Sequence, residues 1–334
     1  ATCLHGSGLD PTVVIGGRLD SLGSNARLGQ GDYLVAEADE SDGSFLLLSP
    51  TVNIITNIDP EHMEYWGSFD ALKDGFVRFA NSVPFYGCTV ACVDHPVVQD
   101  LLPRFRRRII GYGLSALAEY RADRIRMSAG TLSFRVWRRE EALGELSLGV
   151  PGRHNVLNAL AATAVSLELD IPWESVQASL RNFGGVDRRF SVRADVNNIL
   201  LVDDYGHHPV EIQATLSAAA EGYEDRRIIA VFQPHRYSRV QNLLSDFCRC
   251  FNAAAAVVVC PIYAAGEKPI PGVDTDALVR GLREHGHRNV IPVASLDEAQ
   301  SWLQQSLRGG DLCITLGAGD VNRILAPLAE KLRG

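Results

Sequence analysis

The stretch LLVDDYGHHPVEIQATL, residues 200–216, holds a strand, a polar turn and a helix start in one short segment. An apolar run ends in Asp203 and Asp204, and the turn after it carries Tyr205, His207 and His208. The proline that follows suits the first turn of a helix, because a backbone N–H is not needed there. The segment therefore predicts a strand–turn–helix unit whose turn is rich in reactive groups.

The same strand-to-helix order recurs through the C-terminal half. Runs typical of strands lie near residues 198–203, 227–233, 255–260, 290–294 and 311–316. Helical periodicity alternates with them, near 209–220, 238–252, 275–285, 297–307 and 320–332. This alternation predicts a doubly wound, mostly parallel sheet of about 150 residues. The polar segments DDYGHH, QPHRYSR, PIYAAGE and LGAGD follow its strands, at the edge where open α/β sheets bind ligands.

The N-terminal half predicts a second α/β unit. Strand-like runs lie at 33–39, 52–59, 88–94 and 107–113, and the first two read as buried parallel strands. A helix is predicted at 68–83, with Ser68 as its N-cap. Residues 120–150 alternate around a glycine-bearing turn, which predicts an antiparallel meander. Helices follow at 154–169 and just after Pro172.

Length and charge fit a globular protein of two domains. The 334 residues are long for one domain, and we place one α/β domain at 1–185 and a second, with the doubly wound sheet, at 186–334. The formal net charge of −8 argues against a general nucleic-acid or anionic-membrane surface. No apolar stretch approaches the ~20 residues that span a bilayer, and no signal-peptide pattern is present. We expect a cytoplasmic monomer or weak homodimer that binds neither membrane nor nucleic acid.

The seven cysteines form no C-x-x-C pair, and most lie in strand-like or helical apolar runs. An odd number of cysteines without a secretory signal is typical of reduced thiols. A zinc site is therefore not expected.

Acidic residues follow two strand-like runs of the N-terminal half. AEADESD supplies Glu37, Asp39, Glu40 and Asp42, and TNIDPEHMEYW supplies Asp59, Glu61 and His62. Carboxylates and imidazole at these neighbouring strand ends suit Mg²⁺ beside phosphates, since Mg²⁺ takes few protein ligands and keeps several waters. The alternative is that these acids are simply solvated.

The segment PGRHNVLNALAA begins a helix with His154, Asn155 and Asn158. An asparagine amide can donate to and accept from an adenine edge, and Asn155 and Asn158 share one helix face. By spacing alone, the favoured alternative is that an asparagine caps the helix.

Basic side chains cluster in VDRRF and FQPHRYSR, which supply Arg188, Arg189, His235, Arg236 and Arg239. Arg236 and Arg239 are three residues apart at a predicted helix start, so both can face one anion there. Two cations at this end oppose the helix dipole, and that mismatch favours a functional role. The glycine loop LGAGDV is weak evidence by itself.

The turn after Asp204 could be a metal cluster, a catalytic relay or a polar cap. His207 and His208 are adjacent and cannot both chelate one ion from a helix face, which disfavours a metal. Tyr205 can stack on a base while its polar neighbours bond a ribose or an acyl group. A nucleotide-facing loop is the better interpretation.

Together these segments resemble the Mur ligase family. EADESD, TNIDPEHMEYW, NSVPFYG, PGRHNVLNALAA, GVDRRF, DDYGHHP, FQPHRYSR, IYAAGE and LGAGD follow in the family's order and span essentially the whole chain. The resemblance is closest to members that join L-alanine to UDP-N-acetylmuramate in peptidoglycan precursor synthesis. It implies a UDP-binding domain, a central ATPase domain and a C-terminal Rossmann-like domain. It also implies ATP, Mg²⁺, an acyl phosphate on the muramate carboxylate, and attack by the amine of L-alanine.

The resemblance implies roles for single residues. Glu37 and His62 would hold Mg²⁺, with Glu40 as the competitor of Glu37. The residues facing the nucleotide would be His154, Asn155, Asn158, Arg188, Tyr205, and Asp203 or Asp204. The catalytic group, facing the acyl phosphate and the alanine carboxylate, would be His207, His235, Arg236 and Arg239. Lys73 sits where some relatives carry a carbamylated lysine, a role we do not expect here.

One family feature is missing from these residues. Family members carry a GTHGKT-type phosphate loop, whereas this sequence contains no G-x-x-x-x-G-K-[ST]. We therefore expect the central and C-terminal domains of such an enzyme, truncated after that loop, with little or no ligase activity alone. The alternatives are a non-catalytic nucleotide- or partner-binding module and a metal-dependent hydrolase built on His62, His207 and His208.

Overall fold

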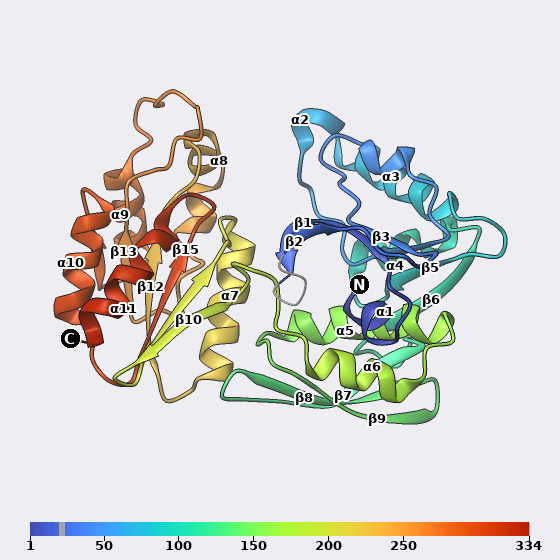
Figure 1. Ribbon diagram of the computed structural model, residues 1–334. Helices are drawn as coiled ribbons and strands as arrows, with labels where there is room; N and C mark the ends of the chain where they lie inside the picture. Colours follow the sequence, from blue (N-terminus) through green and yellow to red (C-terminus); the bar gives the residue numbers. More distant parts are fainter. Residues whose placement is uncertain (20–23, 334) are drawn as a thin grey trace. The chain divides into compact units, whose positions relative to one another are not determined.

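The computed structural model describes residues 1–19 and 24–333, and the chain divides into two compact units (Figure 1). The N-terminal unit comprises Ala1–Met127 and Thr131–Gly184. The C-terminal unit comprises Gly185–Gly334 with the turn Ser128–Gly130. Both contain parallel-rich sheets covered by helices, so the predicted α/β class is confirmed. None of the helices within the described ranges is long and apolar enough to cross a membrane.

The N-terminal unit is built on a six-stranded sheet of order β4-β5-β6-β7-β8-β9. Its strands are β4 (Val52–Ile55), β5 (Cys88–Cys92), β6 (Arg108–Gly113), β7 (Tyr120–Ser128), β8 (Thr131–Arg138) and β9 (Glu141–Leu148). The first four pair in parallel, and β8 pairs with β9 antiparallel. The last three strands are the predicted meander.

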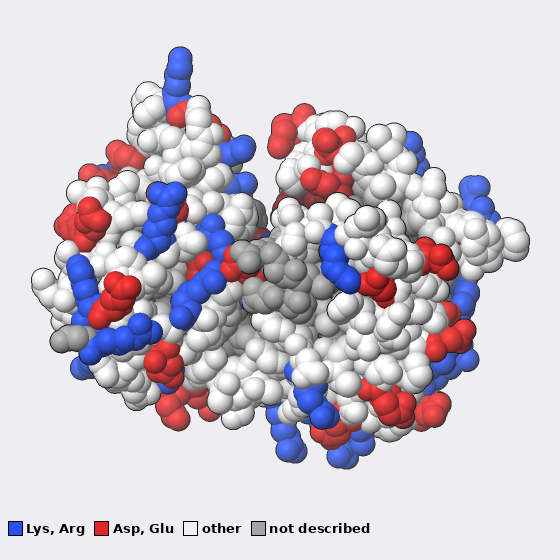
Figure 2. All heavy atoms as spheres, viewed as in Figure 1, with Lys and Arg blue, Asp and Glu red and all other residues white. Residues whose placement is uncertain are grey.

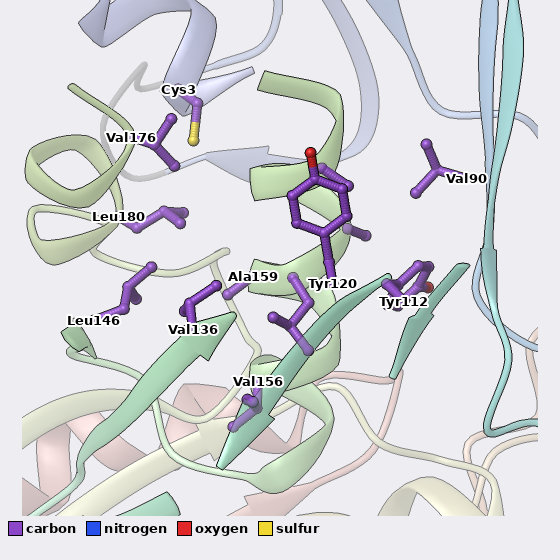
Figure 3. Packing of buried hydrophobic residues seen from close by; sticks show 14 of the residues in the cluster. Cys3, Val90, Tyr112, Tyr120, Val136, Leu146, Val156, Ala159, Val176 and Leu180 are labelled. Carbon is purple, nitrogen blue, oxygen red and sulfur yellow. The ribbon is translucent and has the colours of Figure 1, made fainter. Parts of the chain in front are cut away.

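Helices pack around this sheet, three of them at the predicted positions 68–83, 154–169 and just after Pro172. They are α1 (Thr2–Gly6), α2 (Met63–Trp66), α3 (Phe69–Asn81), α4 (Pro96–Leu101), α5 (Arg153–Glu168) and α6 (Trp173–Arg181). Ser68 caps α3, as predicted, by accepting the N–H of Ala71. Figure 3 shows Val156 and Ala159 of α5 in one apolar layer with Val136 and Leu146 of the meander. This layer fixes the start of α5, where the predicted adenine-facing residues lie.

The prediction for residues 33–39 is wrong in one respect. Instead of a buried strand of the main sheet, they form β3 (Leu34–Ala36), part of a separate three-stranded sheet of order β2-β1-β3. β3 pairs in parallel with β1 (Thr12–Leu19), which pairs with β2 (Ser24–Arg27) on its other side. Leu34 is 65% exposed, so β3 is not a buried strand. The strands before Glu37 and before His62 are therefore not neighbours in one sheet.

The C-terminal unit has a six-stranded sheet of order β10-β11-β15-β12-β13-β14. The strands are β10 (Ser191–Val196), β11 (Ile199–Asp204), β12 (Arg227–Phe232), β13 (Ala256–Val259), β14 (Val290–Pro292) and β15 (Asp311–Leu316). All pair in parallel except β10, which is antiparallel to β11. The five predicted strands are confirmed. β10 was not predicted, because its polar sequence SVRADV lies on a half-exposed sheet edge.

Four helices connect these strands and a fifth follows the last strand, all close to the predicted positions. They are α7 (Pro209–Gly222), α8 (Tyr237–Phe247), α9 (Thr275–Glu284), α10 (Leu296–Ser306) and α11 (Leu325–Arg333). The last predicted helix is divided, because a 3₁₀ turn, Val321–Ile324, precedes α11. The loops after β11, β12, β13 and β15 all leave the carboxyl edge of the parallel strands, as predicted for a ligand site.

All seven cysteines are buried free thiols. Burial raises the pKa of each thiol, to about 12 for Cys260 and Cys313. Because the thiolate is the nucleophile, these side chains are packing groups rather than reactive ones.

Candidate functional site

A metal-compatible group lies beside α2 in the N-terminal unit and consists of Glu40, Glu61 and His62. Their ligand atoms all lie within 4.8 Å of one another. Nε2 of His62 is 3.7 Å from a carboxylate oxygen of Glu40 and 3.9 Å from one of Glu61. About a third of the His62 and Glu40 side chains is exposed, so an ion can enter from solvent. Figure 2 shows acidic side chains gathered over the end of this unit where Figure 1 places α2.

Aromatic packing, rather than strand pairing, brings Glu40 to His62. The indole N–H of Trp66 in α2 donates to the carbonyl oxygen of Glu40 at 2.9 Å. The same ring packs edge-on against the buried Phe45, with centroids 6.2 Å apart. His62 precedes α2 with a φ of 55°, a left-handed conformation that is uncommon outside glycine and clusters at functional sites.

Glu37 lies elsewhere on the small sheet. Its carboxylate accepts the backbone N–H of Gly16 in β1. Within residues 1–19 and 24–333 it joins no metal-compatible group, and His207 and His208 join none either. The structure thus groups Glu40 with His62, and it gives no support to a hydrolase centre on the two histidines. Lys73 pairs with Asp70 at 3.1 Å and lies over the Phe69 ring.

At the start of α5, the asparagines do not cap the helix. Gly152 is the N-cap, so the favoured capping alternative is wrong. The Asn155 amide donates to the carbonyl oxygen of Pro151 at 2.7 Å, and the Asn158 amide donates to Oδ1 of Asn155 at 3.3 Å. The two asparagines therefore share one face, as predicted, and His154 and Asn158 are exposed. This face presents polar groups that a base edge can pair with.

In the C-terminal unit, Asp203 is an internal ion-pair partner. Its side chain is 0% exposed, and its Oδ2 lies 3.1 Å from Nη2 of Arg193 and 3.3 Å from Nε of Arg188. Thr315 donates to its Oδ1 at 3.0 Å. The predicted direct contact of Asp203 with a nucleotide is thus not supported, because the carboxylate is enclosed by its own unit.

Asp204 is buried in the same way. It accepts the backbone N–H groups of Phe190 at 2.8 Å and Gly206 at 2.7 Å. Burial raises the pKa of its carboxyl despite these hydrogen bonds. Asp204 therefore shapes the turn after β11, and the predicted nucleotide contact is not supported for it either.

Arg188 links three loops of the sheet edge. Its guanidinium donates to the carbonyl oxygens of Gly317 at 2.6 Å and Gly319 at 3.3 Å. The same group lies 5.0 Å from the centroid of the Tyr205 ring, and Arg189 lies 5.8 Å from it. Arg188 has a φ of 60°, another strained residue at the predicted site. It acts as a brace that orients Tyr205, which is partly exposed as a stacking surface requires.

Gln233 holds the glycine loop from the other side. Its side-chain oxygen accepts the N–H groups of Asp320 at 2.9 Å and Val321 at 3.1 Å, and its amide donates to the Asp320 carboxylate. A Cβ at Gly319 would come within 2.3 Å of the Gln233 oxygen and 2.9 Å of the Tyr263 ring. The glycine is therefore required for close packing at this point.

His207 is oriented by the turn and by α7. Its Nδ1 lies 3.1 Å from the carbonyl oxygen of Tyr205 and 3.5 Å from a carboxylate oxygen of Glu211. Glu211 also accepts the backbone N–H groups of His207 and His208 and completes a capping box with His208. Burial alone would raise the pKa of Glu211, but these donors and the nearby cations lower it. Burial lowers the pKa of His207.

His235 and the two predicted arginines lie at the start of α8. Arg236 is the N-cap, with a φ of 68°, and Arg239 lies in the first turn, so the predicted helix start is confirmed. Nη1 of Arg239 is 3.3 Å from Nδ1 of His235. The His235 ring stacks on Tyr263 at 5.5 Å and lies 5.8 Å from the His207 ring. The structure thus gathers His207, His235, Arg236 and Arg239 at one sheet edge.

Glu267 resolves the mismatch between these cations and the helix dipole. Its carboxylate accepts the backbone N–H of Ser238 at 3.0 Å and the hydroxyl of Ser238 at 2.6 Å. These hydrogen bonds lower the pKa of Glu267. The acid that α8 lacks in its own first turn therefore comes from the PIYAAGE loop.

Known proteins resemble this chain along its whole length. The UDP-N-acetylmuramate--L-alanine ligase of Geobacter sp. (strain M21) is 52% identical over 333 residues, covering 100% of this chain and 72% of the relative. Sequence profiles match the Mur ligase middle domain at residues 19–166 and the Mur ligase, glutamate ligase domain at residues 188–319. The chain belongs to the Mur ligase family.

Further comparisons agree with this assignment. The UDP-N-acetylmuramate--L-alanine ligase of Sorangium cellulosum is 50% identical to this Mur ligase over 99% of the chain and 71% of the relative. The crystal structure of the Thermotoga maritima UDP-N-acetylmuramate-alanine ligase, MurC, matches with a TM-score of 0.83 and 28% identity, covering 99% of this chain and 70% of that one. A Thermotoga maritima MurF ligase in complex with ADP, 16% identical with a TM-score of 0.77, shares the fold.

Three site residues of the Mur ligase were missed at the level of sequence. Glu211 had a signal, since an acid three residues after a helix cap predicts a capping box. Gln233 and Glu267 had none, because their partners lie 87 and 29 residues away along the chain. Such pairings follow only from the order of strands in the sheet.

Protonation of His235 should make this unit of the Mur ligase acid-sensitive. Burial, with His207, Arg239 and Arg236 nearby, lowers the pKa of His235 from 6.5 to about 4. Between these pH values the unfolded chain binds a proton that the folded chain does not, so stability falls as pH drops from 6.5 to about 4. One pKa unit corresponds to about 1.4 kcal/mol, and the partial exposure of the ring reduces the effect. We therefore expect His235→Gln to remove roughly 1–2 kcal/mol of the change in unfolding free energy across this pH range.

The measurement is urea unfolding of the parent and of H235Q at several pH values across that window. His285→Gln, at the exposed end of α9, is the control and should retain the parent slope. Equal slopes for H235Q and the parent would contradict a His235 that is neutral in the folded protein.

Proposed function

We propose that this Mur ligase takes part in ATP-dependent joining of L-alanine to the carboxylate of UDP-N-acetylmuramate, through an acyl phosphate, in peptidoglycan precursor synthesis. The observation that carries the proposal is 50–52% identity, over at least 99% of the chain, to two ligases named for this reaction. The cluster of two arginines and two histidines at one sheet edge supports it, because the reaction gathers anionic oxygens and an amine.

In the N-terminal unit, we assign Glu40, Glu61 and His62 to a divalent cation, with Glu37 as the alternative carboxylate. Two carboxylates and one imidazole fit Mg²⁺ or Mn²⁺, which keep several waters in such sites. When bound, the ion would neutralise charge on the ATP phosphates. His154, Asn155 and Asn158 remain our proposal for the adenine, since their amides face one way at the start of α5.

In the C-terminal unit, we assign Arg236 and Arg239 to the anionic oxygens of the acyl phosphate and of the alanine carboxylate. Cations that are fixed in place before the reaction stabilise charge as it develops during acyl transfer. Tyr205, braced by Arg188, offers a stacking surface for the nucleotide. Asp203 and Asp204 hold this loop in place from inside the sheet.

The 334 residues alone are expected to form no alanine-dependent ADP. They contain no G-x-x-x-x-G-K-[ST], the motif whose lysine reaches the β- and γ-phosphates and whose hydroxyl binds Mg²⁺. The test compares this polypeptide with a fusion that adds the part of the Geobacter relative that lies outside the match, which covers 72% of that protein. ADP release is measured with and without L-alanine and UDP-N-acetylmuramate.

The fusion should release ADP only with both substrates present. Turnover by the 334 residues alone would contradict the phosphate-loop argument. A fusion that uses another amino acid in preference to L-alanine would overturn the substrate assignment.

A further inference from the structure

His207 and His235 form a pair of imidazole rings with different surroundings. Their centroids are 5.8 Å apart, and the rings come from different loops, one after β11 and one after β12. Tyr205 packs edge-on against the first ring, and Tyr263 stacks on the second. Each ring orientation is thus fixed by an aromatic neighbour, so the partner of each Nδ1 atom determines which nitrogen carries the proton.

The partners of His207 Nδ1 are acceptors. The carbonyl oxygen of Tyr205, at 3.1 Å, has no proton to give. Glu211, at 3.5 Å, has a lowered pKa and is ionised at neutral pH. A neutral imidazole has one N–H, and here it must lie on Nδ1. Nε2 of His207 is therefore unprotonated and can accept a proton.

The partner of His235 Nδ1 is a donor. Nη1 of Arg239 lies at 3.3 Å, and a guanidinium group cannot accept a hydrogen bond. Nδ1 of His235 must therefore be the unprotonated nitrogen, and its Nε2 carries the proton. The neighbouring His208 gives an internal comparison, because its Nδ1 accepts the backbone N–H of Val210.

We infer that His207 and His235 are held in opposite tautomers, so that His207 accepts a proton at Nε2 and His235 donates a hydrogen bond from Nε2 to an anionic oxygen. The catalytic roles in this inference rest on the proposed ligation reaction, whereas the tautomers do not. During amide formation, His207 then acts as the general base and His235 donates a hydrogen bond to the oxyanion.

The chemistry balances on this assignment. The lone pair of the alanine amine forms the C–N bond to the acyl phosphate carbon, and the carbonyl oxygen becomes an oxyanion that accepts from Nε2–H of His235. The extra proton on the new C–N nitrogen moves to Nε2 of His207. The C–O bond to phosphate then breaks, and inorganic phosphate leaves with the electron pair. The proton on His207 passes to solvent.

Both rings are neutral near pH 7.5, as this assignment needs. Burial lowers the pKa of His207. Burial also lowers the pKa of His235, and the neighbouring His207, Arg239 and Arg236 lower it further, to about 4. The charged groups that act on His207 are Glu211, Arg239 and Arg189, and those that act on His235 are Arg239, Arg236 and Glu267.

Long-range ¹⁵N–¹H correlation spectra of the 334-residue chain at pH 7.5, without substrates, test the tautomers. His207→Gln and His235→Gln assign the signals. We expect the proton on Nδ1 in His207, and on Nε2 in His235 and His208. Either ring found in the other tautomer, or doubly protonated, overturns the inference.

Variants of Arg239 test the cause. Arg239→Met should let His235 populate the Nδ1–H form, whereas Arg239→Lys should retain the Nε2–H form, because an ammonium group also only donates. Arg236→Met is the matched control and should change neither ring. If R239M leaves His235 entirely Nε2–H, Arg239 does not set its tautomer and the argument fails. These spectra do not depend on ligation, so failure of the fusion assay and failure of the tautomer assignment are separate results.

Discussion

Replacing Asp203 with asparagine is expected to lower the free energy of unfolding of the C-terminal unit by about 3–5 kcal/mol. The carboxylate is fully buried between Arg188 and Arg193, and the variant keeps its shape while removing its charge. Two guanidinium groups then face a neutral amide, and the buried part of Arg188 lacks its counter-charge. Because Arg188 also holds the carbonyl oxygens of Gly317 and Gly319, the glycine loop should loosen with it.

Urea unfolding of the full chain measures the first effect, and hydrogen exchange at residues 317–320 measures the second. Asp187→Asn is the matched control, since Asp187 contacts the same Arg193 at 2.6 Å but is about one third exposed. That variant should cost at most about 1 kcal/mol. Similar losses in D187N and D203N would show that burial of the Asp203 carboxylate is not the cause.

Metal binding should separate Glu40 from Glu37. We expect Glu40→Gln and His62→Gln each to weaken Mn²⁺ binding at least about tenfold. Mutating residues that only hydrogen-bond to metal ligands already lowers metal affinity about 10- to 100-fold, and loss of a ligand should cost no less. Glu37→Gln should leave the affinity unchanged, because its carboxylate contacts the backbone of Gly16 and glutamine keeps an oxygen acceptor there.

Electron paramagnetic resonance of free Mn²⁺ gives the affinity, and circular dichroism confirms that each variant is folded. Glu64→Gln is a further control, because Glu64 lies 3.9 Å from the other ring nitrogen of His62 but outside the group. Loss of affinity in E37Q with none in E40Q would reverse the assignment and restore the ligand implied by family resemblance.

The strand–helix alternation of the C-terminal half could be read from sequence because each strand is a short apolar run followed by a polar loop. The strands β2 and β10 could not, since most of their residues are at least partly exposed and their sequences follow no burial pattern. The position of residues 33–39 was wrong for the same reason. Apolar character predicts a strand, but it does not show which sheet the strand joins.

For the site, sequence located the loops but not the direction of each side chain. Arg236 and Arg239 were placed correctly, because a helix start fixes their spacing. Asp203 and Asp204 were assigned to a ligand, although the strand end turns both carboxylates into the unit. Glu40 joins His62 through the packing of Trp66 and Phe45, contacts between residues 21–26 positions apart that no local motif encodes.

The buried cysteines make each half of the chain report its own unfolding. Cys3, Cys88 and Cys92 lie in the N-terminal unit, and Cys248, Cys250, Cys260 and Cys313 lie in the C-terminal unit. Alkylating reagents attack thiolates, so a folded unit shields its own set and exposes it only on opening. Mass spectrometry after iodoacetamide treatment would therefore show which half has opened at each urea concentration, without any added label.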